Sequence, residues 1–141
     1  MGFNLNLGLT LVELLVVVAI AAILASVGYP AYQSHVTKSR YADGKAKLLE
    51  ITQLQRRYFT DNNAYTLNLK DELGYTDAID GAVASENGFY LISAVLCRDE
   101  DDNVEPISNC VELSAAATFP DGGVNLTYNT RNEKGGPPKA W

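Results

Sequence analysis

The sequence predicts an α+β protein in which a long N-terminal α-helix packs on an antiparallel β-sheet of three to four strands. An apolar run near the N-terminus, followed by apolar residues at helical spacing, predicts the helix, with a protruding apolar first half and an amphipathic second half. Short stretches after residue 88 carry strand patterns and predict the sheet. A chain of 141 residues accommodates one compact domain and an appendage, not two full domains.

The first half of the predicted helix is apolar enough to cross a membrane. Residues 8–25 read GLTLVELLVVVAIAAILA, and no charged residue lies between Leu14 and Ser34. A helix over those uncharged positions would be roughly 31 Å long, about the thickness of the hydrocarbon core of a bilayer. Glu13 is the one carboxylate in the run, and an ionisable group in a membrane segment normally has a partner or a function. The alternative is a carboxylate at the membrane interface.

Gly28 and Pro30 mark a weak point of this helix. Pro30 has no backbone N–H and clashes with the preceding turn, so it is expected to kink the helix rather than end it. Gly28 adds backbone freedom two residues earlier. The alternative is an ordinary kinked helix without a functional role.

Residues 35–60 have the pattern of an amphipathic helix with one core-facing stripe. The apolar residues of this stripe are Tyr41, Leu48, Ile51, Leu54 and Tyr58. Gly44 falls on the same stripe, where a missing side chain would let a strand or a neighbouring helix approach closely. Alternatively, Gly44 only destabilises the helix, by about 1 kcal/mol relative to alanine.

The rest of the chain changes to strand and turn patterns. The expected strands are Phe89–Leu96, Val111–Ala117 and Val124–Tyr128. A turn signal at residues 120–123 separates the last two. Residues 66–87 are expected to form a loop with one short helix around residues 70–74. The tail at residues 135–138, Gly-Gly-Pro-Pro, is not expected to form regular structure.

The formal net charge of −6 is unevenly distributed. Residues 35–70 carry seven basic against three acidic side chains, whereas residues 71–112 carry eleven acidic side chains against Arg98 alone. Such an acidic region opposes electrostatic binding of DNA, so the basic helix is the one candidate nucleic-acid surface. His35 is the single histidine, and no phosphate-binding loop or zinc spacing occurs, so neither catalysis nor a cofactor is expected.

Two further features concern the acidic segment. The chain has two cysteines, Cys97 and Cys110. An even number of cysteines in a chain with an export-competent N-terminus favours one disulfide outside the cytoplasm. Two free buried thiols are the alternative. Oxygen-bearing residues alternate between these cysteines, at Asp99, Asp101, Asn103 and Glu105, as in the first half of a calcium loop. Val104 replaces the turn glycine and Cys110 the bidentate glutamate, so calcium binding is kept as an alternative and no metal ligand is assigned.

The leader MGFNLNLG precedes the apolar run, whereas a secretory signal peptide places its small-residue cleavage site after such a run. Gly8, the apolar run and Glu13 together resemble the N-terminus of type IV pilins. The resemblance continues through VGYPAYQSHV and SRYADGKAKLLEITQLQRRYFTDNNAYT, a block most similar to minor pilins of the PilE type, and covers roughly the first 66 residues. The leader lacks Lys and Arg, and Leu9 stands where the family typically has Phe.

The resemblance implies a processed, membrane-inserted subunit. Its parts would be a leader peptide (1–8), a hydrophobic transmembrane and polymerisation helix (9–34) and a periplasmic or extracellular globular domain (35–141). A prepilin peptidase would cleave between Gly8 and Leu9 and methylate the new amine of Leu9. In a filament, Glu13 would pair with that amine on a neighbouring subunit. Pilins commonly carry the second cysteine just before the terminal residue, but Ala140 stands there, so the bridge is expected to close the hairpin Cys97–Cys110 and leave the tail unfastened.

The implied function is that of a structural subunit of a bacterial type IV pilus, a minor pilin that supports pilus assembly and pilus-dependent adhesion, twitching motility or DNA uptake. Its partners would be other major and minor pilins, the prepilin peptidase and the inner-membrane assembly machinery. It would cross the inner membrane once before assembly and lie in the extracellular pilus afterwards. Two alternatives stay open: a pseudopilin of a type II secretion system, and a DNA-receptor pilin for competence. On the first interpretation, nucleic acid is not expected among the partners.

Overall fold

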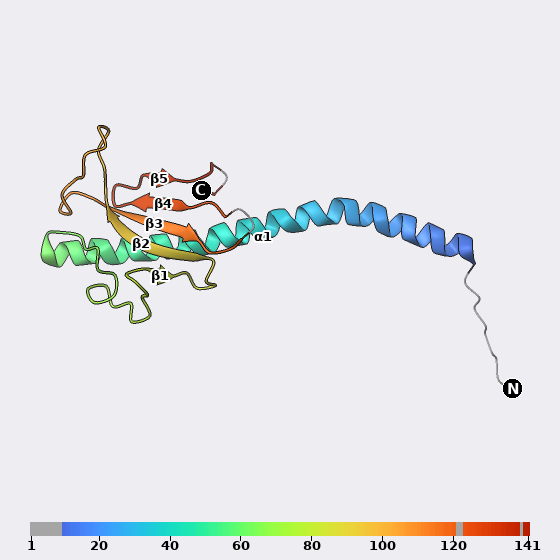
Figure 1. Cartoon of the computed structure of the whole chain (residues 1–141), viewed down its shortest axis with the longest axis horizontal. Coiled ribbons are helices and arrows are strands. Elements are labelled where there is room, and N and C mark those ends of the chain that lie inside the picture. Colours follow the sequence, from blue (N-terminus) through green and yellow to red (C-terminus); the bar gives the residue numbers. More distant parts are fainter. Residues whose placement is uncertain (1–9, 121–122, 139) are drawn as a thin grey trace. The chain divides into compact units, whose positions relative to one another are not determined.

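The computed structural model describes residues 10–120, 123–138 and 140–141. They form one helix and a five-stranded sheet (Figure 1). The elements are α1 (Leu11–Asn62), β1 (Val83–Ala84), β2 (Tyr90–Leu96), β3 (Val111–Ala117), β4 (Leu126–Asn129) and β5 (Lys134–Gly135). The chain divides into two compact units between Thr37 and Lys38.

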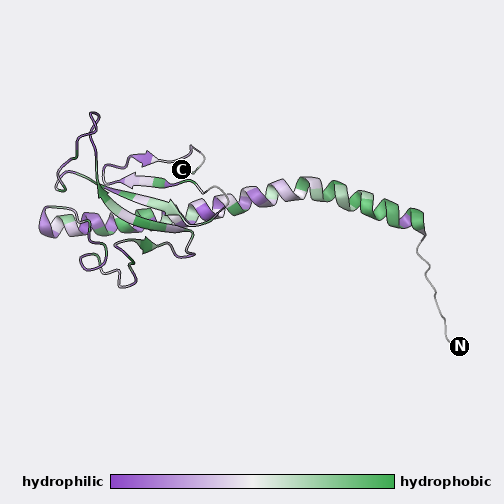
Figure 2. Ribbon diagram, viewed as in Figure 1, coloured by the Kyte–Doolittle hydropathy of each residue, from purple (hydrophilic) through white to green (hydrophobic). Residues whose placement is uncertain are grey.

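In the first unit, α1 is predominantly apolar and exposed from Leu11 to Tyr32 (Figure 2). Its large apolar side chains from Leu11 to Tyr32 are between 52% and 74% exposed. The most apolar 18-residue window has a mean hydropathy of 2.7, and the helix is long and apolar enough to cross a membrane. Such a surface is stable only in lipid or against other apolar surfaces. The helix continues through Gly28 and Pro30, as expected, because Pro30 lies inside α1; the kink stays a prediction.

The second unit is an antiparallel meander of strands covered by the second half of α1. The strand order β1-β2-β3-β4-β5 follows the chain. β2 and β3 pair over their whole length, from Tyr90 opposite Ala117 to Leu96 opposite Val111. The predicted α+β class is confirmed. β1 and β5 lie outside the three expected strand ranges, and they have two residues each, too few for an alternating pattern to register.

The core lies between α1 and the inner face of the sheet. Leu48 and Ile51 are fully buried there, as the helical stripe predicts, while Tyr41, Leu54 and Tyr58 of the same stripe are only half-buried. The strands contribute Val83, Tyr90, Ile92, Leu113, Ala115, Leu126 and Tyr128.

Gly44 allows the closest approach in this core. The ring of Tyr90, which is fully buried on β2, lies where the side chain of residue 44 would be: a Cβ built there would be 2.7 Å from Cδ2 of Tyr90. Real Cβ atoms do not approach other atoms so closely. The predicted role of Gly44 as a site of close approach is confirmed, and the approaching element is a strand.

We expect Gly44→Val to lower the free energy of unfolding by about 1–3 kcal/mol, because the buried ring must move and overpacked cores lose about that much. The higher helix propensity of valine than of glycine offsets less than about 1 kcal/mol of this loss. Urea unfolding followed by circular dichroism measures the difference. Gly28→Val is the matched control, since no atom lies within 4 Å of the added Cβ in the same helix. Equal stability of the two variants would contradict the steric role.

Two expectations for the loops are corrected. The segment expected to contain a short helix around residues 70–74 forms turns instead. It is held by Gln55 of α1, whose side-chain amide donates to the carbonyl of Thr66 (2.6 Å) and accepts from the Thr66 N–H (3.0 Å). Leu69 is fully buried in the same segment.

The C-terminal tail, expected to be irregular and unfastened, is partly ordered by packing. Lys134–Gly135 forms β5. Ala140 is fully buried, and the ring of Trp141 stacks on Tyr128 with centroids 5.5 Å apart. The indole N–H of Trp141 donates to the carbonyl of Gly135 (2.9 Å). An aromatic side chain with one satisfied donor therefore fastens the tail where no disulfide does.

Candidate functional site

The predicted processing site lies outside the described residues. Gly8 and Leu9, the expected cleavage and methylation positions, are not described by the structure, which begins at Thr10. Cleavage and methylation therefore stay predictions.

Glu13 is in the first turn of α1. Thr10 precedes the helix, and its hydroxyl accepts a hydrogen bond from the backbone N–H of Glu13 (3.2 Å), while its carbonyl accepts the first helical bond from Leu14 (3.1 Å). Thr10 is thus the N-cap and Glu13 the third helical residue. Thr-x-x-Glu is the capping-box pattern, a signal that the sequence carried and that sequence reasoning missed. A carboxylate there also interacts favourably with the positive end of the helix dipole.

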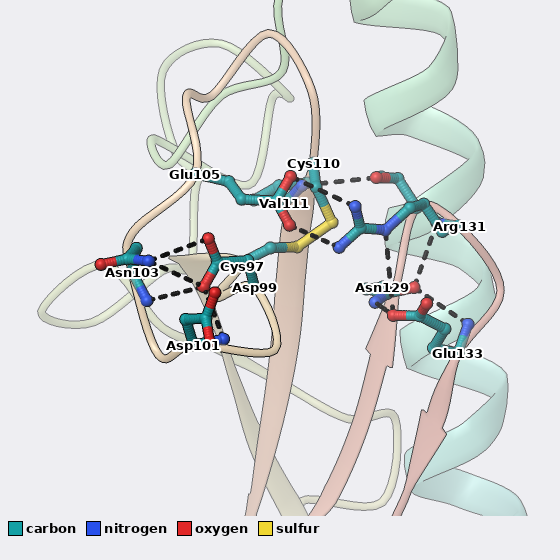
Figure 3. Close-up of polar contacts among 11 residues, drawn as sticks. Cys97, Asp99, Asp101, Asn103, Glu105, Cys110, Val111, Asn129, Arg131 and Glu133 are labelled. Carbon is teal, nitrogen blue, oxygen red and sulfur yellow. Dashed lines mark hydrogen bonds and ion pairs between the residues drawn. A yellow bond between two sulfur atoms is a disulfide. The ribbon is translucent and has the colours of Figure 1, made fainter.

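The disulfide joins the end of β2 to the start of β3. Cys97 and Cys110 are bonded, with Cα atoms 5.6 Å apart, directly after the last β2–β3 pair (Figure 3). Both cysteines are buried. The predicted bridge is confirmed, and it closes an acidic loop.

The side chains of this loop bind one another. The carboxylate of Asp99 accepts hydrogen bonds from the backbone N–H groups of Asp101 (3.0 Å) and Asn103 (2.8 Å) and from the Asn103 amide. The bonds from Asn103 hold the pKa of Asp99 below its usual value. Glu105 instead binds Arg131 through both carboxylate oxygens, at 2.7 and 3.2 Å. Within the described residues no group of three or more His, Cys, Asp or Glu side chains could hold a metal ion, so the calcium alternative gains no support.

Arg131 connects the disulfide loop to the turn after β4 (Figure 3). Besides Glu105 it lies 3.8 Å from the carboxylate of Glu133, and the hydrogen bond with Glu105 raises the pKa of Arg131. Oδ1 of Asn129 accepts hydrogen bonds from the backbone N–H groups of Arg131 (3.1 Å) and Glu133 (2.9 Å), and these two bonds fix the turn.

A basic face runs along α1 within the second unit. Lys38, Lys45 and Arg56 are separated by 7 and 11 residues, so at 100° per residue they lie within about 20° of one line on the helix. Arg56 donates hydrogen bonds to the carbonyl of Thr130 and to the side chain of Asn132, both in the β4–β5 turn. The β5 edge of the sheet therefore lies beside this face. Lys134 of β5 lies over the ring of Trp141. We call Lys38, Lys45, Arg56 and Lys134 the basic face.

The opposite border of α1 carries acidic side chains that anchor the β1 side of the sheet. Oδ1 of Asp43, which is 8% exposed, accepts hydrogen bonds from the backbone N–H (3.1 Å) and the side-chain amide (2.9 Å) of Asn87. Burial raises the pKa of Asp43, but donors from Ser85 and Asn87 outweigh it, so the pKa lies below its usual value. Glu50 accepts from the Tyr75 hydroxyl (2.7 Å) and binds Lys47.

We expect Asp43→Asn to cost about 1.5–3 kcal/mol at pH 7, the range for hydrogen bonds to a charged group. Because the folded pKa is lowered, this stability is present above the unfolded pKa of about 4 and is lost as the pH falls through the folded pKa. The deficit of the variant should therefore shrink below about pH 4. Urea unfolding between pH 3 and pH 7 measures it, with the exposed Asp77→Asn as control. A deficit independent of pH would contradict the carboxylate's role.

These features define a class of protein: an α+β subunit whose single long helix is an exposed apolar rod in one half and a core element in the other. A family described as type IV minor pilin ComP, DNA uptake sequence receptor, matches residues 30–122, and one described as the prokaryotic N-terminal methylation motif matches residues 4–29. Because the first match covers about two thirds of the chain, the chain belongs to the type IV minor pilin ComP family. The resemblance to type IV pilins is confirmed.

Curated relatives are also pilus proteins. The type IV major pilin protein PilA of Myxococcus xanthus (strain DK1622) is 31% identical over 70 residues, which are 50% of this chain and 31% of the relative. The fimbrial protein EcpC of Eikenella corrodens is 30% identical over 89 residues, 63% of this chain and 53% of the relative. The matches thus span about a third to a half of the relatives' length. No solved structure matches the chain.

Proposed function

We propose that the chain is a minor subunit of a type IV pilus, with a structural rather than an enzymatic role. The observation that carries this proposal is the first half of α1, which is exposed and apolar on every side and begins with a single carboxylate. An apolar surface of this kind needs lipid before assembly and the helices of other subunits afterwards.

Processing would prepare the helix for both environments. A prepilin peptidase would cleave after Gly8 and methylate the amine of Leu9, and the match to the methylation-motif family over residues 4–29 supports this step. The chain would then cross the inner membrane once, with residues 35–141 in the periplasm, until the pilus assembly machinery transfers it to a filament. There Glu13 would meet the amine of a neighbouring subunit.

The test is recovery of the chain in filaments sheared from cells, together with imaging of surface pili after deletion of the gene. The proposal expects the chain in the sheared fraction and fewer or shorter pili without it. Absence from the filaments together with normal pili would overturn it. Normal pili with a defect in the export of folded proteins would favour the pseudopilin of a type II secretion system instead.

A second candidate function is binding of DNA during uptake, which the description of the matching family names for that family. The basic face favours it in this chain. Its lysines (Lys38, Lys45 and Lys134) are separate from the acidic side chains Asp43 and Glu50, which bind Asn87 and Tyr75 at the other border of α1. No acidic partner is found for these three lysines among the residues that the structure describes. Adhesion and twitching motility are properties of the whole filament.

If the basic face binds DNA, the full chain in detergent micelles should bind duplex DNA at low salt. Removing one phosphate contact changes the slope of log K against log salt by about 0.9. Lys45→Ala and Lys134→Ala should therefore each flatten the slope by about that amount. Lys47→Ala is the control, because its ammonium is bound to Glu50 at 3.1 Å. Absence of DNA affinity at low salt would eliminate this candidate.

A further inference from the structure

One edge of the sheet is only half covered. β1 pairs with β2 at two positions, Val83 with Ile92 and Ala84 with Leu91. β2 continues to Leu96, and along residues 93–96 it pairs with β3 on one side only. The last four residues of β2 therefore form a sheet edge (Figure 1).

The main-chain groups at this edge point outward. The carbonyl of Tyr90 accepts the N–H of Ser85 on the β1 side, while that of Phe89 accepts the N–H of Thr118 on the β3 side. The main-chain N–H and C=O groups of successive residues point to opposite sides of a strand. Those of Ala94 and Leu96 therefore point to the β1 side, as those of Tyr90 do. Within the described residues these groups have no hydrogen-bond partner. Unpaired strand edges of this kind accept a further strand.

A groove lies along the same edge, with a volume of about 650 Å³. It is lined by Leu67, Ala94, Val95, Leu96, Arg98, Val104 and Glu112. Leu67, Val95 and Val104 are 41%, 40% and 54% exposed, although they are apolar. Main-chain hydrogen-bonding groups beside apolar surface are the combination that recognises an extended peptide.

The charge beside the groove indicates what kind of segment fits. Residues 98–105 carry five carboxylates against one arginine. Arg98 lies 3.4 Å from Asp102, and Glu105 is bound by Arg131. The other three carboxylates, Asp99, Glu100 and Asp101, add negative charge that no cation of the described residues balances. A second copy would bring the same negative loop to this edge, which repulsion disfavours. A cationic segment would be attracted.

We propose that the edge of β2 at residues 93–96 binds an extended, lysine- or arginine-bearing segment of another protein as an added strand. The segment would exchange hydrogen bonds with Ala94 and Leu96, place apolar side chains against Val95 and Val104, and bring its cations to the loop at residues 98–105. This surface shares no residue with the apolar half of α1 or with the basic face.

The test uses the full chain in detergent micelles and the peptide acetyl-KVTVKVTK-amide, with acetyl-EVTVEVTE-amide as its charge-reversed control. Amide hydrogen exchange by NMR should show at least about ten-fold slower exchange at Ala94 and Leu96 with the first peptide. Ser93 and Val95 are internal controls, because their N–H groups already face β3. The acidic peptide should bind at least about ten-fold more weakly, and the difference should narrow with salt.

Two variations separate strand addition from simple charge attraction. N-methylation of the alternate peptide N–H groups that face β2 should weaken binding about ten-fold, while methylation of the other set should leave it within about two-fold. Val104→Lys in the groove should weaken binding similarly, whereas Val124→Lys, at an exposed valine outside the groove, should not. Unchanged exchange at Ala94 and Leu96, or equal effects of the two methylation patterns, would overturn the proposal. Protection of these amides that rises with chain concentration and without peptide would assign the edge to a second copy.

Discussion

Replacement of Glu13 by alanine is expected to leave membrane insertion intact and to prevent most of the chain from entering filaments. Insertion should persist because the substitution only removes a charge from an apolar segment. Incorporation should fail because an amine on a neighbouring subunit would lose its partner in apolar surroundings. Breaking one side of a buried ion pair typically costs about 3–5 kcal/mol, which is a factor of about 10² to 10³ or more in an equilibrium constant. Quantitative blots of membrane and sheared-pilus fractions measure both results.

The capping geometry supplies the decisive control. Because Glu13 follows the N-cap Thr10 at the third helical position, Glu13→Ala also removes the glutamate of the capping-box pattern. Glutamine serves the capping box equally well but carries no charge. Glu13→Gln should therefore fail in filaments as severely as Glu13→Ala. If the glutamine variant assembles normally, Glu13 acts only as part of the cap and the intersubunit pair is wrong.

Loss of the disulfide is expected to be the largest single change to the stability of the globular unit. The bridge closes a loop between residues separated by 13 positions, and removing a native disulfide of this kind costs about 2–5 kcal/mol. Because it follows the last β2–β3 pair, the double variant Cys97→Ala, Cys110→Ala should loosen that end of the sheet first. Urea unfolding gives the total cost, and hydrogen exchange at Leu96 and Val111 gives its location.

Asp101→Ala in the same loop is the matched control, since it changes the loop without opening it. It should stay within about 0.5 kcal/mol of the natural chain. A double cysteine variant as stable as this control would contradict a structural role for the bridge.

The parts of the fold that could be predicted from the sequence have long or self-contained patterns. The uncharged run and the helical stripe around Leu48 and Ile51 predicted α1. β3 matches its expected bounds, with the buried Val111, Leu113 and Ala115 alternating with Glu112 and Ser114. Gly44 could be interpreted because a missing side chain on a buried stripe has few explanations. The disulfide followed from there being two cysteines.

The parts that could not be predicted depend on contacts between distant residues. β1 and β5 exist because β2 and β4 offer them an edge, and two residues carry no pattern of their own. The tail is ordered because Trp141 finds Tyr128 and Gly135. Asp43 and Gln55 are polar residues at buried helix positions, where hydrophobicity gives no guidance and only their partners Asn87 and Thr66 explain them.

The two hydrogen bonds between Gln55 and Thr66 also affect the conformational entropy of the long connection between α1 and β1. Residues 63–82 contain no helix or strand, yet they are fastened at Thr66, at the buried Leu69 and at Tyr75. Since closure entropy depends on the length of each free stretch, this segment amounts to several short loops in series. Its surface can therefore change between the fastening points without altering the chain's path, so the connection is an accommodating place for an inserted label.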